Sequence, residues 1–516
     1  MLRSEFYAHR PPTVELRQTH ISYVLLAGDA VYKVKKPVRF AFLDFSTLER
    51  RRHFCREEVR LNRRLAADVY HGVAAICARG DGFALAGEDA ADAVEYAVHM
   101  RRLPNDRMLT TLLERNAVDA ALIDAIADKL AGFHAAADRG PEVARGGDPE
   151  VLAQLMDDDF REVDVYHGDT IAAADDLTIR RFCHAFLRSH DALLRGRQAA
   201  GRIRDGHGDL HAEHICCTDP LVIYDCIEFN PQFRHRDVAA EIAFLAMDLV
   251  FRGRPDLADH LVDRYGALAG DAELARLVPF YACHRAYIRG KVDSLKSSEA
   301  EVSAEERAAA RQSAVAYFAL AYRYTWVYSP CLVVVVGLSG TGKSTVAAAL
   351  HGRTGFAHIN SDVTRKRLAG LAPTERPGPD LYTPARSAAT YAAMYAAAGQ
   401  ALAAGRGAIL DATFQRRVDR DAARAAARRA GVPILFVECD LPPGAVRARL
   451  AERGRGNADP SDADWRVYQQ QRTRYEAFAP DELAQRLAVD TRQPPERLLA
   501  DIERRLHEMT GGTRDR

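Results

Sequence analysis

The sequence predicts two domains of different fold class: an α+β domain, followed by an α/β domain built on a five-stranded parallel sheet. Three observations carry this prediction. The chain has 516 residues, which is enough for two or three domains. Residues 20–38 hold two adjacent apolar strands, and from about residue 108 most segments have the pattern of helices. From residue 331 onward, short β-branched runs alternate with Ala-rich helical stretches, which is typical of a parallel α/β sheet.

The composition is that of a globular protein with balanced charge. Hydrophobic residues make up 48% of the chain and charged residues 28%, which excludes wholesale disorder. The 71 Lys and Arg residues equal the 71 Asp and Glu residues, which disfavours a general nucleic-acid or membrane-surface binder but does not exclude a local basic patch. The first residues lack the apolar stretch of a secretory signal, no apolar run is long enough to span a bilayer, and the nine cysteines form no C-x-x-C pair. We therefore expect a cytoplasmic protein that does not bind membranes.

The N-terminal elements follow from local turn and helix signals. Gly28-Asp29 separates the two apolar runs, as a tight hairpin turn would. A helix is expected over residues 46–66 and a further strand over residues 94–100. These elements predict a small antiparallel sheet that precedes a larger helical region.

One domain boundary is visible in the sequence. Ser303 and Glu306 have the spacing of a capping box, which indicates the start of an apolar helix. Ser329-Pro330 then separates this helix from a strand of the buried type. We place the boundary near residue 328, so that the predicted domains are residues 1–328 and 329–516.

The C-terminal domain is predicted from its alternation of strands and helices. Helices are expected over residues 385–404 and 416–430, and Gly431 lies at the position that ends the second helix. The five expected strands are short and largely apolar. They lie at residues 333–336, 358–359, 408–410, 434–437 and 486–489.

A glycine-rich loop follows the first of these strands and opens a helix. Residues 337–344 read Gly-Leu-Ser-Gly-Thr-Gly-Lys-Ser, which is the G-x-x-x-x-G-K-S pattern of a P-loop. In such a loop the backbone N–H groups surround phosphates, Lys343 reaches the β- and γ-phosphates, and the Ser344 hydroxyl binds Mg²⁺. We therefore predict that ATP and Mg²⁺ bind here. The residues expected to contact them are Gly337, Ser339, Gly340, Thr341, Gly342, Lys343, Ser344 and Thr345.

Charged residues after the later strands add further parts of a phosphotransfer site. Asp362 could orient or deprotonate an acceptor hydroxyl, or it could only cap the helix that follows it. Asp411 ends a parallel strand, where a carboxylate can join the Mg²⁺ shell. Arg449 and Arg453 lie beside a glycine-rich turn at 454–457 and could hold the transferred phosphoryl group. In so Arg-rich a chain, each of them also fits a solvated surface residue.

Over about residues 331–510 the chain resembles the small P-loop kinases of the gluconate-kinase and polynucleotide-kinase-like group. The resemblance rests on the P-loop and on the segments Ser-Asp-x-x-Arg-Lys (361–366) and Asp-Ala-Thr-Phe (411–414). It implies that Asp362 is the base on the acceptor side and that the arginines of the lid are clamp residues. It leaves the acceptor open.

A second constellation of phosphotransfer residues lies in the N-terminal domain. Asp209, in a His-Gly-Asp-Leu-His loop, precedes an apolar strand that ends at Asp225. One Asp could accept a hydroxyl proton while the other holds Mg²⁺. Upstream, Lys33 and Lys35 alternate on one face of a strand, and Glu58 on the next helix could pair with one of them. Each cluster alone also fits a charged sheet edge or ordinary loop packing, but their order favours function.

This order of residues resembles the aminoglycoside phosphotransferase family, which has a protein-kinase-like fold, over roughly residues 15–325. The resemblance implies that Asp209 is the catalytic base, that Asp225 is a metal ligand, and that Lys33, or else Lys35, is the strand lysine that pairs with Glu58. It also points to a bacterial branch in which such a domain is fused to a P-loop kinase, with Asp237 and Glu241 supporting the catalytic loop.

One residue departs from that family pattern. The metal-binding Asn that the family has five residues after the base is His214 here. Mg²⁺ prefers oxygen ligands, whereas imidazole suits softer metals. The sequence therefore leaves open which metal Asp225 and His214 bind, and whether this domain is fully active.

The function predicted from the sequence is that of an ATP-binding tandem phosphotransferase. The P-loop kinase domain is expected to act on a hydroxyl group of a small molecule, and the N-terminal domain is expected to be a second kinase-like phosphotransferase. Two alternatives stay open. One is a kinase for the 5′-hydroxyl of nucleic acids, and the other is a P-loop kinase regulated by an N-terminal pseudokinase that senses a ligand.

Overall fold

The chain forms two compact units, Met1–Ala321 and Tyr322–Arg516. The computed structural model describes residues 1–40, 43–80, 82–372, 375, 379–453 and 463–511. The division falls a few residues before the boundary predicted near residue 328, because the last residues of the apolar helix, from Tyr322 onward, belong to the second unit. The Tyr322 hydroxyl donates to Glu503 over 2.8 Å, and the buried Trp326 ring lies 4.2 Å from the His507 ring.

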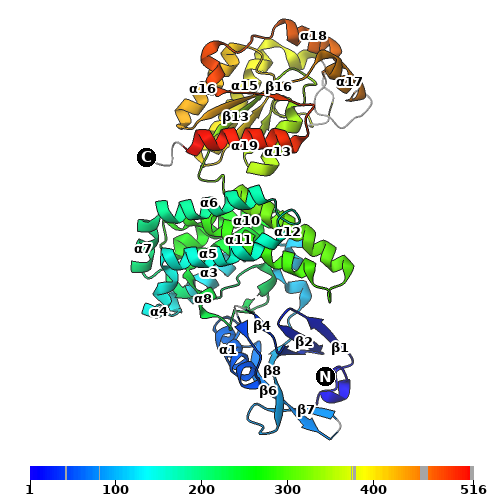
Figure 1. Cartoon of the computed structure of the whole chain (residues 1–516), viewed down its shortest axis with the longest axis vertical. Helices are drawn as coiled ribbons and strands as arrows, with labels where there is room; N and C mark the ends of the chain where they lie inside the picture. The colour runs from blue at the N-terminus through cyan, green and yellow to red at the C-terminus, as the bar shows by residue number, and fades with distance from the viewer. Residues whose placement is uncertain (41–42, 81, 373–374, 376–378, 454–462, 512–516) are drawn as a thin grey trace. The chain divides into compact units, whose positions relative to one another are not determined.

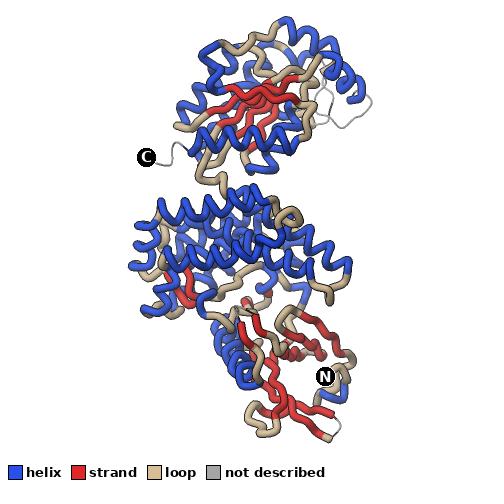
Figure 2. Tube along the Cα trace, viewed as in Figure 1, coloured by secondary structure: helices blue, strands red, loops and turns tan. Residues whose placement is uncertain are grey.

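The first unit begins with an antiparallel six-stranded sheet of order β1-β2-β3-β8-β6-β7 (Figures 1 and 2). The predicted hairpin turn joins β2 to β3, and Gly28 adopts a φ of +66°, a region that favours glycine. Helix α1 (Leu48–Ala66) packs against β6 and β8, and its Thr47 cap accepts from the Arg50 amide. The strands are β1 (Val14–Gln18), β2 (Ser22–Ala27), β3 (Ala30–Lys35), β6 (Tyr70–Arg79), β7 (Gly82–Gly87) and β8 (Ala93–Arg101).

The rest of the first unit is mainly helical, as the sequence predicts (Figure 2). Helix α9 is its centre: every residue from Val238 to Leu249 is buried, and α10 and α11 pack against it. The Ser303–Glu306 capping box is present at the start of α12. The helices are α2 (Leu109–Glu114), α3 (Ala120–Ala136), α4 (Pro141–Ala144), α5 (Pro149–Val163), α6 (Ala173–Ser189), α7 (Asp191–Ala199), α8 (Pro231–Arg234), α9 (Val238–Phe251), α10 (Pro255–Ala269), α11 (Leu274–Ser298) and α12 (Ala304–Tyr324). Among the short strands, β4 (Arg39–Phe40) and β5 (Leu43–Asp44) lie between β3 and α1. The others lie between the helices: β9 (Ile203–Asp205), β10 (Ile215–Cys216), β11 (Val222–Ile223) and β12 (His235–Asp237).

The second unit confirms the predicted five-stranded parallel sheet, with the order β14-β15-β13-β16-β17. Helices α13 and α19 cover one face and α15 and α16 the other (Figure 1). The central strands are buried because both faces are covered, which explains their continuous apolar sequence. The strands are β13 (Leu332–Val336), β14 (Ala357–Asn360), β15 (Ala408–Asp411), β16 (Ile434–Asp440) and β17 (Arg486–Asp490). The helices are α13 (Lys343–Thr354), α14 (Ser361–Leu368), α15 (Pro384–Ala403), α16 (Arg417–Ala430), α17 (Pro443–Arg453), α18 (Trp465–Thr473) and α19 (Pro495–Gly511).

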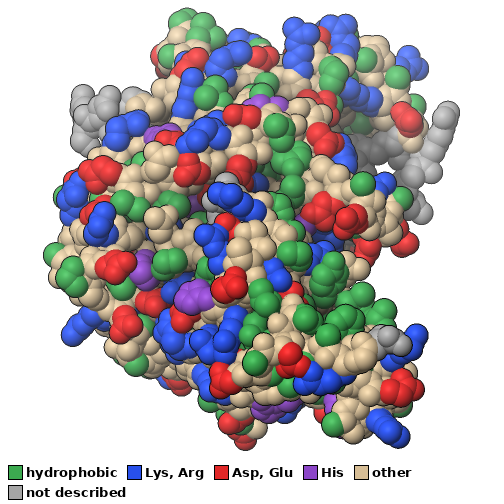
Figure 3. Space-filling model, turned by 60° about the horizontal axis from the view of Figure 1, so that its bottom comes forward, with side chains coloured by type: hydrophobic (Ala, Val, Ile, Leu, Met, Phe, Trp, Pro, Cys, Tyr) green, Lys and Arg blue, Asp and Glu red, His purple; other side chains and the backbone are tan. Residues whose placement is uncertain are grey.

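The surface reflects the balanced composition. Blue Lys and Arg side chains and red Asp and Glu side chains are interspersed over the face shown in Figure 3. Among the residues that the structure describes, no helix combines the length and the apolarity that a membrane crossing requires.

A buried ion network fixes the helical region of the first unit. Arg197 on α7 is 1% exposed, and its guanidinium binds the carboxylates of Asp237 and Asp271 over 2.5–2.8 Å. Asp237 therefore has a structural partner, and its predicted contact with the Asp209 loop is not among those that the structure describes. Because both carboxylates are buried, each depends on the arginine for its charge partner.

Replacing Arg197 with Met should therefore destabilise the first unit by about 3–5 kcal/mol, since it leaves two buried carboxylates without a cation. Arg195→Met is the matched control, because Arg195 lies on the same helix, is 45% exposed and should change stability by less than about 0.5 kcal/mol. Hydrogen exchange of the α9 amides as a function of urea concentration measures both values. Equal effects of the two substitutions would contradict the prediction.

Candidate functional site

The glycine-rich loop of the second unit lies between β13 and α13 and is tightly closed. Gly342 has a φ of +91°, which other residues rarely adopt. A Cβ on Gly337 would lie 2.7 Å from the Thr341 hydroxyl oxygen, so the turn tolerates only glycine there. Helix α13 begins at Lys343, whose Nζ donates to the Leu338 carbonyl over 2.9 Å. The loop thus holds its lysine folded over its own backbone.

Oxygen donors gather next to this loop. The Asp411 carboxylate is 1% exposed, and its Oδ2 accepts from Asn360 Nδ2 over 2.7 Å. The same Asn360 nitrogen lies 3.4 Å from Ser344 Oγ, so the amide bridges the carboxylate and the hydroxyl. Burial raises the pKa of Asp411, but His358, Lys343 and Asn360 outweigh it, and the pKa falls below its ordinary value. Carboxylate and hydroxyl oxygens fit Mg²⁺.

Asp362 lies in the same cleft, which has a volume of about 1,110 Å³. Its Oδ1 accepts from the Arg365 guanidinium over 2.5 Å. The idea that Asp362 caps α14 is wrong, because Asn360 is the cap: its Oδ1 accepts from the amides of Asp362 and Val363 over 2.9 and 3.1 Å. The Asp362 carboxylate is therefore not used as a cap, and one of its two oxygens is bound to Arg365. The predicted loop residues that line this cleft are Ser339, Gly340, Gly342, Lys343, Ser344 and Thr345.

Arg449 is anchored beside the glycine-rich loop. Its guanidinium donates to the Thr491 carbonyl over 2.7 Å and to the Thr491 hydroxyl over 3.1 Å. That hydroxyl in turn donates to the Thr341 carbonyl over 2.7 Å. Arg453 ends α17, but its side chain and the turn at 454–457 lie outside the described residues. The sequence did not indicate Thr491, nor Gln471, whose Oε1 accepts from the Ser339 amide.

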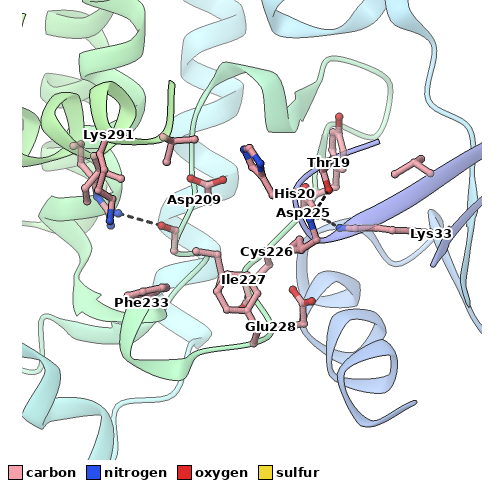
Figure 4. A pocket seen from close by; sticks show the side chains of 18 of the residues that line it. Thr19, His20, Lys33, Asp209, Asp225, Cys226, Ile227, Glu228, Phe233 and Lys291 are labelled. Carbon is pink, nitrogen blue, oxygen red and sulfur yellow. Dashed lines mark hydrogen bonds and ion pairs between the residues drawn. The ribbon is translucent and has the colours of Figure 1, made fainter. Parts of the chain in front are cut away.

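A second cleft, of about 1,200 Å³, lies in the first unit (Figure 4). Lys33 of β3 points into it, and its Nζ binds Asp225 Oδ1 over 2.6 Å and Glu58 Oε1 over 2.9 Å. Lys35 is completely buried and pairs with the other Glu58 oxygen, over 2.6 Å, and with Glu228. Burial lowers the pKa of Lys33, but Asp225 and Glu58 raise it well above its ordinary value. Lys33 is therefore the lysine that faces the cleft, and Lys35 lies beneath it.

The Asp209 loop forms the opposite wall of this cleft. Burial raises the pKa of Asp209, but the neighbouring His211, which lies 3.5 Å away, and His214 bring it well below its usual range. The loop is held from α9, since Glu241 accepts from the amides of His207 (2.7 Å) and Gly208. A further contact, from His134 Nε2 over 2.9 Å, fixes the Glu241 carboxylate itself. The expected support by Glu241 is thus a direct contact in the structure.

His214 faces Asp225 across this cleft. Its Nδ1 lies 2.8 Å from the Asp209 carbonyl oxygen, and because a carbonyl only accepts, Nδ1 carries the proton. Burial lowers the pKa of His214, which favours a neutral ring whose Nε2 is an acceptor, and this Nε2 lies 3.6 Å from Asp225 Oδ2. This pair offers one nitrogen and one oxygen ligand, which fit Mn²⁺ or Zn²⁺ better than Mg²⁺. The two clefts therefore differ in the metal that their side chains favour.

The fold and the loop geometry define the second unit as a P-loop nucleotide-binding domain. Residues 332–478 match the family model described as AAA domain, which confirms the P-loop prediction. The whole chain belongs to the family of the uncharacterized proteins Rv2004c of Mycobacterium tuberculosis and Mb2027c of Mycobacterium bovis. It is 33% identical to each over 456 residues, which cover 87% of this chain and 88% of each relative.

Similar solved structures each cover about a third of the chain. One is a sugar kinase from Janibacter sp. HTCC2649, with 24% identity, a TM-score of 0.26, and coverage of 34% of this chain and 92% of that one. Another is a gluconokinase from Sinorhizobium meliloti 1021, with 23% identity, a TM-score of 0.26, and coverage of 36% and 95%.

The Glu241 contacts predict a pH-dependent stability. Burial alone would raise the pKa of Glu241. His134 and the loop amides have the larger, opposite effect, so that the pKa is about 2, against an ordinary value of 4.5. A depressed pKa stabilises the fold above pH 4.5, and this stabilisation is lost as the pH falls towards 2. Glu241→Gln should therefore cost about 3 kcal/mol at pH 7 and progressively less below pH 4.5. Urea unfolding of wild type and variant from pH 7 to pH 3 tests this. The exposed Glu114→Gln is the control, and a gap independent of pH would contradict the prediction.

Proposed function

We propose that the second unit is an ATP-dependent kinase that transfers the γ-phosphoryl group of ATP to a hydroxyl group of a small molecule. The observation that carries this proposal is the gathering of Lys343, Ser344, Asp411 and Asp362 around one cleft. A cleft of about 1,110 Å³ suits a nucleotide together with a small acceptor. The match to the AAA domain supports the nucleotide-binding half of the proposal.

The roles follow from the chemistry of each side chain. Asp362 accepts the proton of the acceptor hydroxyl as its oxygen bonds to the γ-phosphorus and the bond to the β–γ bridging oxygen breaks. Lys343 neutralises charge on the phosphates. Ser344 and Asp411 are the residues that hold Mg²⁺, which supplies charge neutralisation when bound. Arg449 stabilises the transferred group from its anchor on Thr491.

We propose that the first unit is a second phosphotransferase. The specific observation is that Lys33 contacts both Glu58 and Asp225, while the Asp209 carboxylate lines the same cleft. A lysine tied to a helix glutamate can hold nucleotide phosphates, and an Asp on the other wall can accept a hydroxyl proton. In the competing proposal the first unit binds a ligand and regulates the second, and His214 at the metal position favours that alternative.

Substitutions in the second unit separate binding from transfer. Lys343→Ala should lower both ATP affinity and ATP turnover by this unit roughly 100-fold or more, because it removes the charge that faces the phosphates. Asp362→Asn should keep ATP affinity and lower turnover by roughly 10²–10⁴-fold. Asp421→Asn serves as the control, because Asp421 on α16 is exposed and does not line the cleft. Phosphotransfer to a library of hydroxyl compounds, read by product mass, is the measurement; full turnover in Asp362→Asn overturns the assignment of the base.

The first unit is tested in the Lys343→Ala background, where the remaining phosphotransfer belongs to it. Asp209→Asn should lower this remaining turnover by roughly 10²–10⁴-fold and leave ATP binding intact. Each assay is run with Mg²⁺ and with Mn²⁺, because His214 Nε2 and Asp225 offer a mixed ligand pair. If ATP binds but Asp209→Asn changes no turnover with either metal, the sensor alternative replaces the phosphotransferase proposal.

A further inference from the structure

On the helical side of the first unit's cleft, Arg236 and Arg285 have no acidic partner among the described residues. Arg236, on β12, is 9% exposed, and its Nη1 donates only to the backbone carbonyls of Gly146 (3.2 Å) and His235 (3.0 Å). Arg285, on α11, donates to the carbonyl of Gly208 over 3.2 Å. Across the described ranges of the chain, neither guanidinium has a carboxylate within ion-pair distance.

Other buried arginines of this protein are paired with acids. Arg197 binds two carboxylates, Arg234 binds Asp205 over 2.7 Å, and Arg420 of the second unit binds Glu482 over 2.9 Å. A buried cation without a counter-ion is costly, so the buried Arg236, and to a smaller extent the half-buried Arg285, need a separate explanation. The two guanidiniums also repel each other: burial, followed by Arg285, lowers the pKa of Arg236 to about 10.

The charges of Glu241, Asp209 and Asp159 act on Arg285, but Asp159 and the neighbouring Glu162 are already paired with other groups. Asp159 binds Lys291 over 2.6 Å and His284 over 2.9 Å, and Glu162 binds the same Lys291 over 2.7 Å. Figure 4 shows Lys291 and Asp209 on the helical side of the cleft, away from Lys33. This side therefore combines the Asp209 carboxylate with two guanidiniums that have no ion-pair partner among the described residues. A negatively charged ligand would supply the partner that these two guanidiniums lack.

We infer that this side of the cleft binds an oxyanion-bearing hydroxyl compound, whose carboxylate or phosphate group contacts Arg236 and Arg285 and whose hydroxyl lies at Asp209. The inference that an anion binds here depends only on the two arginines. The role of the ligand's hydroxyl group rests on the proposed phosphotransferase function of the first unit. A polycationic acceptor, such as an amino sugar, meets two unpaired cations here and is disfavoured. Planar, permanently charged guanidiniums suit both carboxylate and phosphate.

A structural role for the two arginines predicts different behaviour. In that role Arg236 and Arg285 only tie down the Gly146 and Gly208 carbonyls, and a neutral hydrogen-bond donor partly replaces them. In an anion site the charge itself is required. Arg→Gln keeps donors but removes charge, whereas Arg→Lys keeps charge, so the pair of substitutions separates the two roles.

The experiment uses the full chain with Lys343→Ala, which removes phosphate binding by the P-loop. The probes are glycerate and glycerol 3-phosphate, with glycerol as the neutral match and spermidine as the cation, and binding is measured by calorimetry. We expect at least one anion to bind about tenfold or more tightly than glycerol, and Arg236→Gln or Arg285→Gln to remove this preference. The Arg→Lys variants should retain most of it. Arg276→Gln, exposed on the same helix as Arg285, should change nothing.

Several outcomes overturn the inference: no anion binds better than glycerol, spermidine binds as well as the anions, or both Arg→Gln variants keep the anion preference. If an Arg→Gln variant fails to fold, as judged by circular dichroism, its Arg→Lys partner and the anion dependence of the parent protein decide. Anion binding that depends on the arginines, without phosphotransfer to either anion, supports the site and counts against the phosphotransferase function. Comparison of glycerate with glycerol 3-phosphate shows which oxyanion the site takes.

Discussion

The cleft of the first unit depends on one buried carboxylate, that of Glu58. Its two oxygens bind two lysines of β3: Lys33 over 2.9 Å and Lys35 over 2.6 Å. Lys33 also binds Asp225, and Lys35 also binds Glu228. Helix α1, the sheet and the loop after β11 therefore meet in one cluster of charged side chains. Because each buried charge needs its partners, no member can move alone without a large cost. The helix, the strand and the loop are therefore fixed relative to each other before any ligand binds.

The two units position their proposed phosphotransfer residues by different physical means. In the second unit a glycine-rich loop places Lys343 and Ser344 at the start of α13, and side chains such as Thr491 and Gln471 brace that loop. In the first unit the loop with Asp209 is held by carboxylates of the buried helix α9: Glu241 accepts from the loop, and Asp248 accepts from the Ala212 amide over 2.9 Å. A helix buried on all sides carries such carboxylates only where they are fully hydrogen-bonded.

Short-range sequence patterns predicted most helices and strands. The features that the sequence did not predict are set by contacts between residues that lie far apart in the chain. The hairpin at Gly28, the P-loop and the parallel sheet depend on short-range patterns, so the sequence indicated them. Alternation along β3 placed Lys33 and Lys35 on one face, but only packing against α1 shows that Lys33 faces the cleft. The cap of α14 was misplaced by two residues, because Asn360 and Asp362 are both good capping residues. Arg236 and Arg285 carry no local signal, since what distinguishes them is the absence, among the described residues, of an acid near them in space.

The difference between the two clefts has a chemical consequence. The second unit offers oxygen donors, Ser344 and Asp411, which suit a hard cation beside phosphates. The first unit offers His214 Nε2 beside Asp225, and it adds positive charge on the side where we propose that the acceptor binds. A cleft that already holds unpaired cations needs less charge from a metal to attract an anion, and it needs a metal mainly to organise nucleotide phosphates. The imidazole of His214, in place of an oxygen ligand, is therefore compatible with phosphate binding. It changes which metal the cleft favours, and it does not change whether the cleft attracts anions.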